Sequence, residues 1–331
     1  EARDAVRRRE VRAAALAEAA LEALALWQPY TNAAAAIERD RALRMAEAVD
    51  AALAAGRDPV PLAGVPMAHK DMMYRAGRRA ACGSRVLAEH VPDVTATVLA
   101  RLDAAGAVDC GTLNMAEFAY NPTGHNAHTG HVRNPWNRDH VPGGSSSGSG
   151  AAVACGAVFA ALGSDTGGSI RFPAACCGVT GIKPTLGRVS RAGTMPLSAS
   201  LDTIGPLART ARDCALVLAA IAGADPADPH CDTAPVPDWM AGLDAGARGL
   251  SVGVAAGSLS DGLDPGVAAI LAEVPAAWRA AGATVVELPP LGLAPLRALH
   301  LTVLMAEAAA THGHWLDGHE QALTPLTAAS L

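Results

Sequence analysis

A strand–helix–strand pattern near the C-terminus constrains the fold of this chain most. The segments LSVGVAA (250–256) and TVVELP (284–289) are short and apolar, as buried strands are. Between them, Asp264 can cap a helix that begins at Pro265 and ends near Ala281, just before a glycine. Strands joined in this way form a β-α-β unit, which predicts an α/β layered fold.

The rest of the chain also alternates between helices and strands. Ala-rich charged segments predict helices over residues 1–26 and about 33–55, and Asn32 is the expected N-cap of the second. A buried strand is expected to end near Lys70 in PLAGVPMAHKDM. Further elements are helices in VTATVLARLDAAGAV (94–108) and LARTARDCALVLAAIAG (207–223), a strand reaching Cys110, and a buried helix followed by a strand in GAAVACGAVFAALGSD (150–165).

Composition and charge limit the class of protein. With 331 residues, half of them hydrophobic, the chain can bury a sizeable core. The net charge of −6, with no basic tract beyond Arg7–Arg9, argues against nucleic acid as a direct partner. Seven cysteines without a C-x-x-C pair favour free thiols in a reducing cytosol. The start lacks a secretory signal, and the longest apolar run is too short to span a bilayer, so we expect a cytoplasmic protein without a membrane partner.

Two Gly/Ser-rich segments, GGSSSGSG (143–150) and GSDTGGSIRFP (163–173), carry the densest signal. A flexible linker is disfavoured, because these segments lie mid-chain between core-like elements. A phosphate loop would need Gly-Lys-Ser/Thr, or a dinucleotide motif after a strand, and neither is present. Residues 144–148 match the nucleophile elbow G-x-S-x-G, but the preceding NPWNRDHVP is a poor strand.

A serine–lysine site is the third interpretation. Lys70 is one of two lysines among 26 basic residues. A desolvated lysine can become neutral and act as a base, whereas arginine keeps its proton. Such a base can activate a serine. The segment TGGS (166–169) places two glycines before a serine, so that backbone N–H groups can converge as an oxyanion hole requires.

Taken together, these segments resemble the amidase signature family. PLAGVPMAHKDMM, NPWNRDHVPGGSSSGSGAAVACG and ALGSDTGGSIRFP match its motifs in order and with the expected gap, and the resemblance runs from about residue 30 to the end. It implies one α/β/α layered domain with a mixed central sheet over residues 1–331. Within it we expect a helical segment at about 1–55, a catalytic core at about 60–220 and a β-α-β region at about 249–331. Family members extend further, so we expect part of the C-terminal region to be missing.

The resemblance also implies roles for individual residues in a Ser-Ser-Lys triad. Lys70 would be the base, Ser145 the bridging serine on a cis peptide, and Ser169 the nucleophile that forms an acyl-enzyme. Ser147 stands where the family usually has glycine, which leaves the local backbone open. The other expected site residues are the backbone oxyanion donors Thr166, Gly167, Gly168 and Ser169, the supporting Ser146, and Arg171, which either binds a substrate carboxylate or pairs with a buried acid.

The implied function is hydrolysis of a small-molecule carboxamide to a carboxylate and ammonia or an amine, without a cofactor. The alternatives are a glutaminase-type member of a tRNA-dependent amidotransferase, which needs partner subunits, and a catalytically inactive truncated remnant. A homodimer is compatible with the resemblance.

Four further groups have structural expectations. A metal is not expected at the loop histidines, because no cysteine or paired carboxylate lies nearby. Cys176 and Cys177 are expected to pack in the interior, Glu117 to accept structural hydrogen bonds, and Lys183 to be structural. The loop histidines are His125, His128, His131 and His140.

Overall fold

The computed structural model describes residues 1–57, 60–255 and 262–331. It divides into two compact units, Glu1–Pro237 with Leu304–Leu331, and Asp238–Val303. The residues with an expected catalytic role all lie in the first unit, so that unit positions the candidate site.

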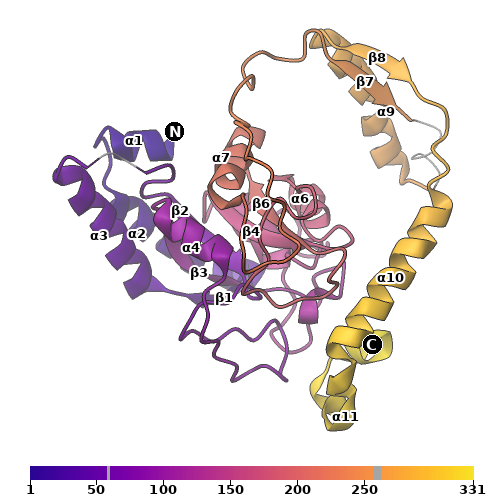
Figure 1. Ribbon diagram of the computed structural model, residues 1–331, viewed down its shortest axis with the longest axis horizontal. Coiled ribbons are helices and arrows are strands. Elements are labelled where there is room, and N and C mark those ends of the chain that lie inside the picture. The colour runs from indigo at the N-terminus through magenta and orange to yellow at the C-terminus, as the bar shows by residue number, and fades with distance from the viewer. Residues whose placement is uncertain (58–59, 256–261) are drawn as a thin grey trace. The chain divides into compact units, whose positions relative to one another are not determined.

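A six-stranded mixed sheet forms the centre of the first unit (Figure 1). Strand β2 is parallel to both of its neighbours, β3 and β4, whereas β1, β5 and β6 are antiparallel to theirs. The predicted mixed α/β class is therefore confirmed. In spatial order the strands are β1 (Ala34–Ile37), β3 (Val108–Leu113), β2 (Pro66–Lys70), β4 (Ala160–Asp165), β6 (Thr203–Ala208) and β5 (Thr180–Gly181).

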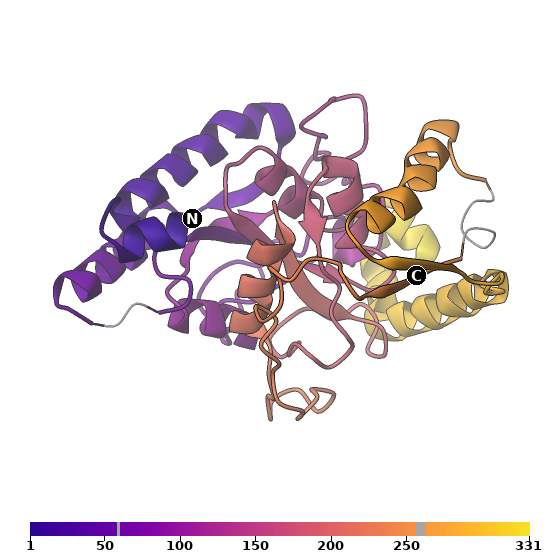
Figure 2. The ribbon, with the colours of Figure 1, turned by 90° about the horizontal axis from the view of Figure 1, so that it is seen from above.

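Helices cover both faces of this sheet (Figure 2). On one face, α2, α3, α5 and α6 share a core of small side chains with the strands, including Ala17, Ala68, Ala151 and Ala161. On the other, α4 and α7 pack against each other, and α7 packs against β6. These helices are α2 (Ala13–Thr31), α3 (Arg39–Ala54), α4 (Thr97–Ala104), α5 (Ser147–Ala154), α6 (Arg171–Cys177) and α7 (Ala211–Ile221), preceded by α1 (Ala2–Arg7).

Small residues let α5 approach β4 closely. A Cβ atom added to Gly163 would lie 2.8 Å from Ser146 Oγ and 2.9 Å from Leu207 Cδ1. Real Cβ atoms do not come this near to other heavy atoms, so the position requires glycine. This contact brings the start of α5 against the end of β4, where the two Gly/Ser-rich segments meet.

The junction after α2 differs from the prediction. The helix continues through Pro29 to Thr31, and Asn32 is its left-handed C-cap, with φ of 52°. The expectation that Asn32 caps a following helix was wrong, because β1 intervenes before α3. The Gln28 amide exchanges two 2.8 Å hydrogen bonds with the backbone of Ala34, so a side chain supplies the partner for this short edge strand.

The predicted helix over 207–223 begins later than expected. Leu207 and Ala208 belong to β6, and α7 begins at Ala211 after Thr210, whose hydroxyl accepts a capping hydrogen bond of 3.1 Å from a backbone N–H. Pro206 lies inside β6, and proline within a strand is unusual, which obscures the strand signal in the sequence.

The second unit contains the predicted β-α-β pattern. β7 (Ser251–Val254) is parallel to β8 (Thr284–Glu287), and α9 (Pro265–Ala280) connects them in sequence. Asp264 caps α9 by accepting a 2.8 Å hydrogen bond from Gly266. Position 256 of the predicted first strand lies outside the described residues. The chain continues through α10 (Ala294–His312), η2 (Gly313–Trp315), α11 (Leu316–His319), η3 (Glu320–Ala322) and α12 (Pro325–Ser330).

The described helices were also compared with the dimensions of a bilayer. None of them combines the length and the apolar character that crossing it would require.

Candidate active site

Lys70 ends β2 in the interior of the first unit. Every residue of β2 is buried, and the Lys70 side chain has 0% exposure. Its Nζ atom lies 2.7 Å from Ser145 Oγ and 2.7 Å from Ser164 Oγ. The lysine that the sequence singled out therefore contacts one of the two serines expected in the triad.

Burial makes this lysine a candidate base. Loss of solvent lowers the pKa of Lys70 to about 7, although the negative charges of Asp202 and Asp165 and the Cys82 thiol act in the opposite direction. A large fraction of Lys70 is therefore neutral near neutral pH, and a neutral amine can accept a proton from a hydroxyl.

A tight turn before α5 presents Ser145. The peptide bond between Gly144 and Ser145 is cis, as the resemblance implied. A Cβ on Gly144 would lie 2.5 Å from Gly124 N, so a side chain does not fit there. Ala116 donates a 3.1 Å hydrogen bond to the Ser145 carbonyl oxygen. Ser147, which replaces the family's usual glycine, is accommodated as the first residue of α5.

Ser169 lies in the loop between β4 and α6 and is 9% exposed. The Ser146 N–H donates a 3.3 Å hydrogen bond to the Ser169 carbonyl oxygen, which joins the two serine loops. Across residues 1–57, 60–255 and 262–331, no hydrogen bond links Ser145 Oγ to Ser169 Oγ. The contact between the lysine and the first serine is thus formed, and the contact between the serines is not.

Asp165 organises the loop that carries Ser169. Its fully buried carboxylate accepts hydrogen bonds from the N–H groups of Gly168, Ile170 and Arg171, at 2.8, 3.1 and 3.3 Å. Arg171 adds two more, from Nε at 3.0 Å and Nη2 at 2.8 Å. Burial favours a higher pKa for Asp165, but the hydrogen bonds and charge of Arg171 hold this pKa below its usual range. Of the two roles expected for Arg171, the structure thus has the pairing with a buried acid.

The same carboxylate changes the expected oxyanion hole. The Gly168 N–H points at Asp165, so it is not available to a substrate, and its expected role as a donor was wrong. The Thr166 hydroxyl donates a 2.5 Å hydrogen bond to Asp202. The N–H groups of Gly167 and Ser169 make no hydrogen bond within the part of the chain that the structure describes. They are the backbone donors that remain for an oxyanion.

Sequence reasoning missed Ser164 and Asp202. Ser164 is 1% exposed in β4 and directly contacts Lys70. Asp202 binds Thr166 with one oxygen and accepts hydrogen bonds from the N–H groups of Leu197 and Ser198, at 2.8 and 3.0 Å, with the other. A serine in an apolar strand and an aspartate in a turn carry no local signal, because their partners come from distant segments.

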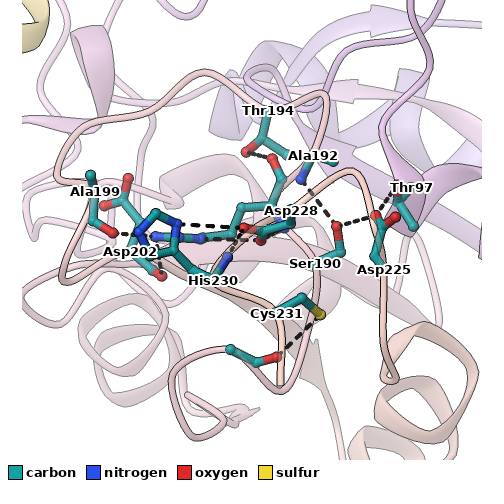
Figure 3. A network of polar contacts seen from close by, with 12 residues as sticks. Thr97, Ser190, Ala192, Thr194, Ala199, Asp202, Asp225, Asp228, His230 and Cys231 are labelled. Atoms are coloured by element: carbon teal, nitrogen blue, oxygen red, sulfur yellow. Dashed lines mark hydrogen bonds and ion pairs between the residues drawn. The ribbon is translucent and has the colours of Figure 1, made fainter. Parts of the chain in front are cut away.

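A polar network lies close to Asp202 (Figure 3). The Arg191 N–H donates a 2.8 Å hydrogen bond to Asp228, and Ser190 and Thr97 donate hydrogen bonds of 2.5 and 2.6 Å to Asp225. A cavity of about 210 Å³ lies here and shares Asp202 with the catalytic loop. Its other lining residues include Arg191, Thr194, Pro196, Asp228 and His230.

The remaining candidates have structural partners. Glu117 is buried and accepts hydrogen bonds from Ser84 Oγ and Thr324 N, both at 2.7 Å, as expected of a structural acid. His128 Nε2 lies 3.1 Å from the Glu117 carboxylate. Lys183 Nζ donates a 2.8 Å hydrogen bond to the carbonyl oxygen of Pro184. Among the described residues, no group of three or more potential ligands is placed to hold a metal.

The vicinal cysteines behave differently from each other. Cys177 is buried as expected, but Cys176 is exposed, because consecutive residues of a helix face different directions. None of the seven cysteines forms a disulfide.

Comparison with known proteins agrees with this site. The family model described as Amidase matches residues 15–324. One curated relative, from Roseiflexus sp. (strain RS-1), is the GatA-type component of glutamyl-tRNA(Gln) amidotransferase. It is 49% identical to the chain over 267 residues, which cover 81% of this chain and 55% of that relative. The chain thus spans little more than half the length of this curated relative.

Solved structures give the same match. The native peptide amidase of Stenotrophomonas maltophilia superimposes with a TM-score of 0.86 at 36% identity, covering 96% of this chain and 66% of that one. The corresponding glutamyl-tRNA(Gln) amidotransferase component of Thermotoga maritima gives a TM-score of 0.80 at 33% identity, with coverage of 89% and 62%.

Proposed function

This chain belongs to the amidase family, and from that premise we propose that it hydrolyses a carboxamide to a carboxylate and ammonia or an amine. The observation that carries the proposal is the hydrogen bond between Lys70 Nζ and Ser145 Oγ, at 2.7 Å in a fully buried setting. A base of lowered pKa against a hydroxyl, beside a loop with free backbone donors, is the equipment of acyl transfer.

In the proposed mechanism a proton moves along the triad. Neutral Lys70 accepts the proton of Ser145 Oγ, and Ser145 accepts the proton of Ser169 Oγ. Ser169 Oγ then attacks the amide carbon, and the N–H groups of Gly167 and Ser169 stabilise the negative oxygen. The relayed proton passes to the leaving nitrogen as the C–N bond breaks. Water then hydrolyses the resulting ester, which releases the carboxylate and restores Ser169.

A second candidate has support of its own. The relatives from Roseiflexus and Thermotoga are both named as components of glutamyl-tRNA(Gln) amidotransferase. By this proposal the chain would act as a glutaminase-type component that releases ammonia from glutamine and depends on partner subunits. The same triad serves both candidates, so the site alone does not separate them.

The surroundings of the protein are part of the proposal. The net charge of −6 supports a small-molecule amide, rather than nucleic acid, as the direct partner. Seven unpaired cysteines support a reducing compartment such as the cytoplasm.

Ammonia release from a panel of primary carboxamides and glutamine tests the proposal. The chain alone should release ammonia from simple carboxamides, and Lys70→Ala should abolish this. Release from glutamine, with a requirement for partner subunits, would favour the second candidate. A folded chain that binds amides but turns none over would contradict both and indicate an inactive remnant.

A further inference from the structure

We propose that Ser164 is a positioning residue that directs the lone pair of Lys70 towards Ser145. This inference rests on the proposed function, because it assigns a role within the same proton transfer. It adds a fourth polar side chain to the expected Lys70, Ser145 and Ser169.

The coordination of Lys70 Nζ carries the argument. Its hydrogen-bond partners in the described structure are Ser145 Oγ and Ser164 Oγ, both at 2.7 Å, and the side chain is closed to solvent. A neutral amine has two N–H donors and one lone pair. To accept a proton from Ser145, the lone pair must face Ser145, so an N–H must find its acceptor elsewhere. Ser164 Oγ provides that acceptor.

The Ser164 hydroxyl is also held in place. Ser146 Oγ accepts a 3.2 Å hydrogen bond from the Ser164 N–H and donates one of 3.2 Å to its carbonyl oxygen. Ser164 also pairs with Ile204 of β6 in the antiparallel ladder. In the described residues, the Ser164 side chain has no hydrogen-bond partner besides Lys70. A rigid backbone therefore presents a hydroxyl dedicated to the lysine.

Ser164 also affects the charged form of Lys70. After proton transfer the ammonium group still donates to Ser164 Oγ, and this hydrogen bond stabilises the charge. The other groups that act on this charge are Asp165 at the end of β4, Asp202 before β6 and Cys82 in the loop after β2. Removing the hydroxyl leaves those groups unchanged but removes one stabilising contact. The pKa of Lys70 should then fall further, while the orientation of its lone pair is lost.

The test compares Ser164→Ala with the conservative Ser164→Thr, which keeps a hydroxyl. A matched control is Ser149→Ala, because Ser149 is equally buried but its Oγ donates a 3.0 Å hydrogen bond to the Leu162 carbonyl oxygen instead of contacting Lys70. For each full-length variant, the rate of covalent labelling by a fluorophosphonate is measured from about pH 5 to about pH 10, together with the thermal unfolding midpoint.

Ser164→Ala should lower the limiting labelling rate about ten- to a hundredfold and move the pH midpoint of the profile to lower pH. Ser164→Thr should restore much of the rate, and Ser149→Ala should keep the wild-type midpoint. If Ser164→Ala only lowers the unfolding temperature and keeps the wild-type profile, as Ser149→Ala does, the inference is wrong. If Lys70→Ala and Ser169→Ala label normally, the proposed function itself fails.

Discussion

The Nζ atom of Lys70 lies 2.7 Å from the Oγ atom of Ser145, although 75 residues separate them in sequence. Strand β2 delivers the lysine and the turn before α5 delivers the serine. The pairing of β2 with β4 and the packing of α5 on β4 bring the two together. The chemistry proposed for this chain depends on this relationship, and the following predictions examine its consequences.

The pH dependence of labelling should follow Lys70. Because burial lowers its pKa to about 7, the neutral base becomes dominant as pH rises through that value. The rate of fluorophosphonate labelling should therefore rise with a midpoint near pH 7 and level off above it. A rate that is flat between about pH 6 and about pH 9 would contradict the role of Lys70 as base.

Asp165→Asn should disturb the nucleophile loop without unfolding the protein. The amide keeps the shape of the side chain but loses the charge that holds Arg171 and three backbone N–H groups. We expect labelling to slow by about ten- to a hundredfold. Arg171→Gln should have a smaller effect, because the Arg171 side chain is 54% exposed and solvent screens its charge. Wild-type labelling by Asp165→Asn would show that the loop holds its conformation without this carboxylate.

Gly163→Ala should damage both stability and labelling. The new Cβ would overlap Ser146 Oγ and Leu207, so α5 and β4 must separate. Overpacking of this kind costs about 1–3 kcal/mol. Gly313→Ala is the control, since no atom lies within 4 Å of its added Cβ. Chemical denaturation measures the difference, and equal unfolding midpoints for both variants would refute the close approach of α5 and β4.

His69 should make the fold sensitive to acid. Burial lowers the pKa of His69 to about 4, and the Arg78 and Arg75 charges add to this although Asp109 opposes it. The unfolded chain therefore binds more protons than the folded one between about pH 6.5 and about pH 4, and stability falls as pH falls through this window. The full effect is about 3 kcal/mol.

The free energy of unfolding across that range checks the prediction. His69→Gln should flatten the dependence, and the exposed His140→Gln should leave it unchanged. A His69→Gln variant with the same slope as the wild type would assign the acid sensitivity to other groups.

How far the sequence predicts the site depends on the range over which each signal acts. Lys70 stands out because lysine is rare in this chain, and Ser169 because two glycines precede it. Both signals are local, as is the capping Asp264. Ser164, in contrast, contacts Lys70 only because β4 lies beside β2, and strand order is not encoded in any short segment.

Competition between hydrogen-bond acceptors explains the other differences. Gly168 belongs to the motif, yet its N–H is taken by Asp165, three residues earlier. Asn32 has the composition of an N-cap, but the Gln28 side chain pairs with Ala34 and turns the following residues into a strand. In both cases the residue type was recognised, and the partner that decided its role was not.

Labelling with a fluorophosphonate, followed by peptide mapping, tests the central claim most directly. The account predicts one adduct per chain, on Ser169, and loss of that adduct in Lys70→Ala while the folded spectrum is retained. An adduct on Ser146 would indicate an ordinary nucleophile elbow in its place. An unlabelled but folded wild-type chain, or labelling of Ser169 that persists without Lys70, would contradict the account.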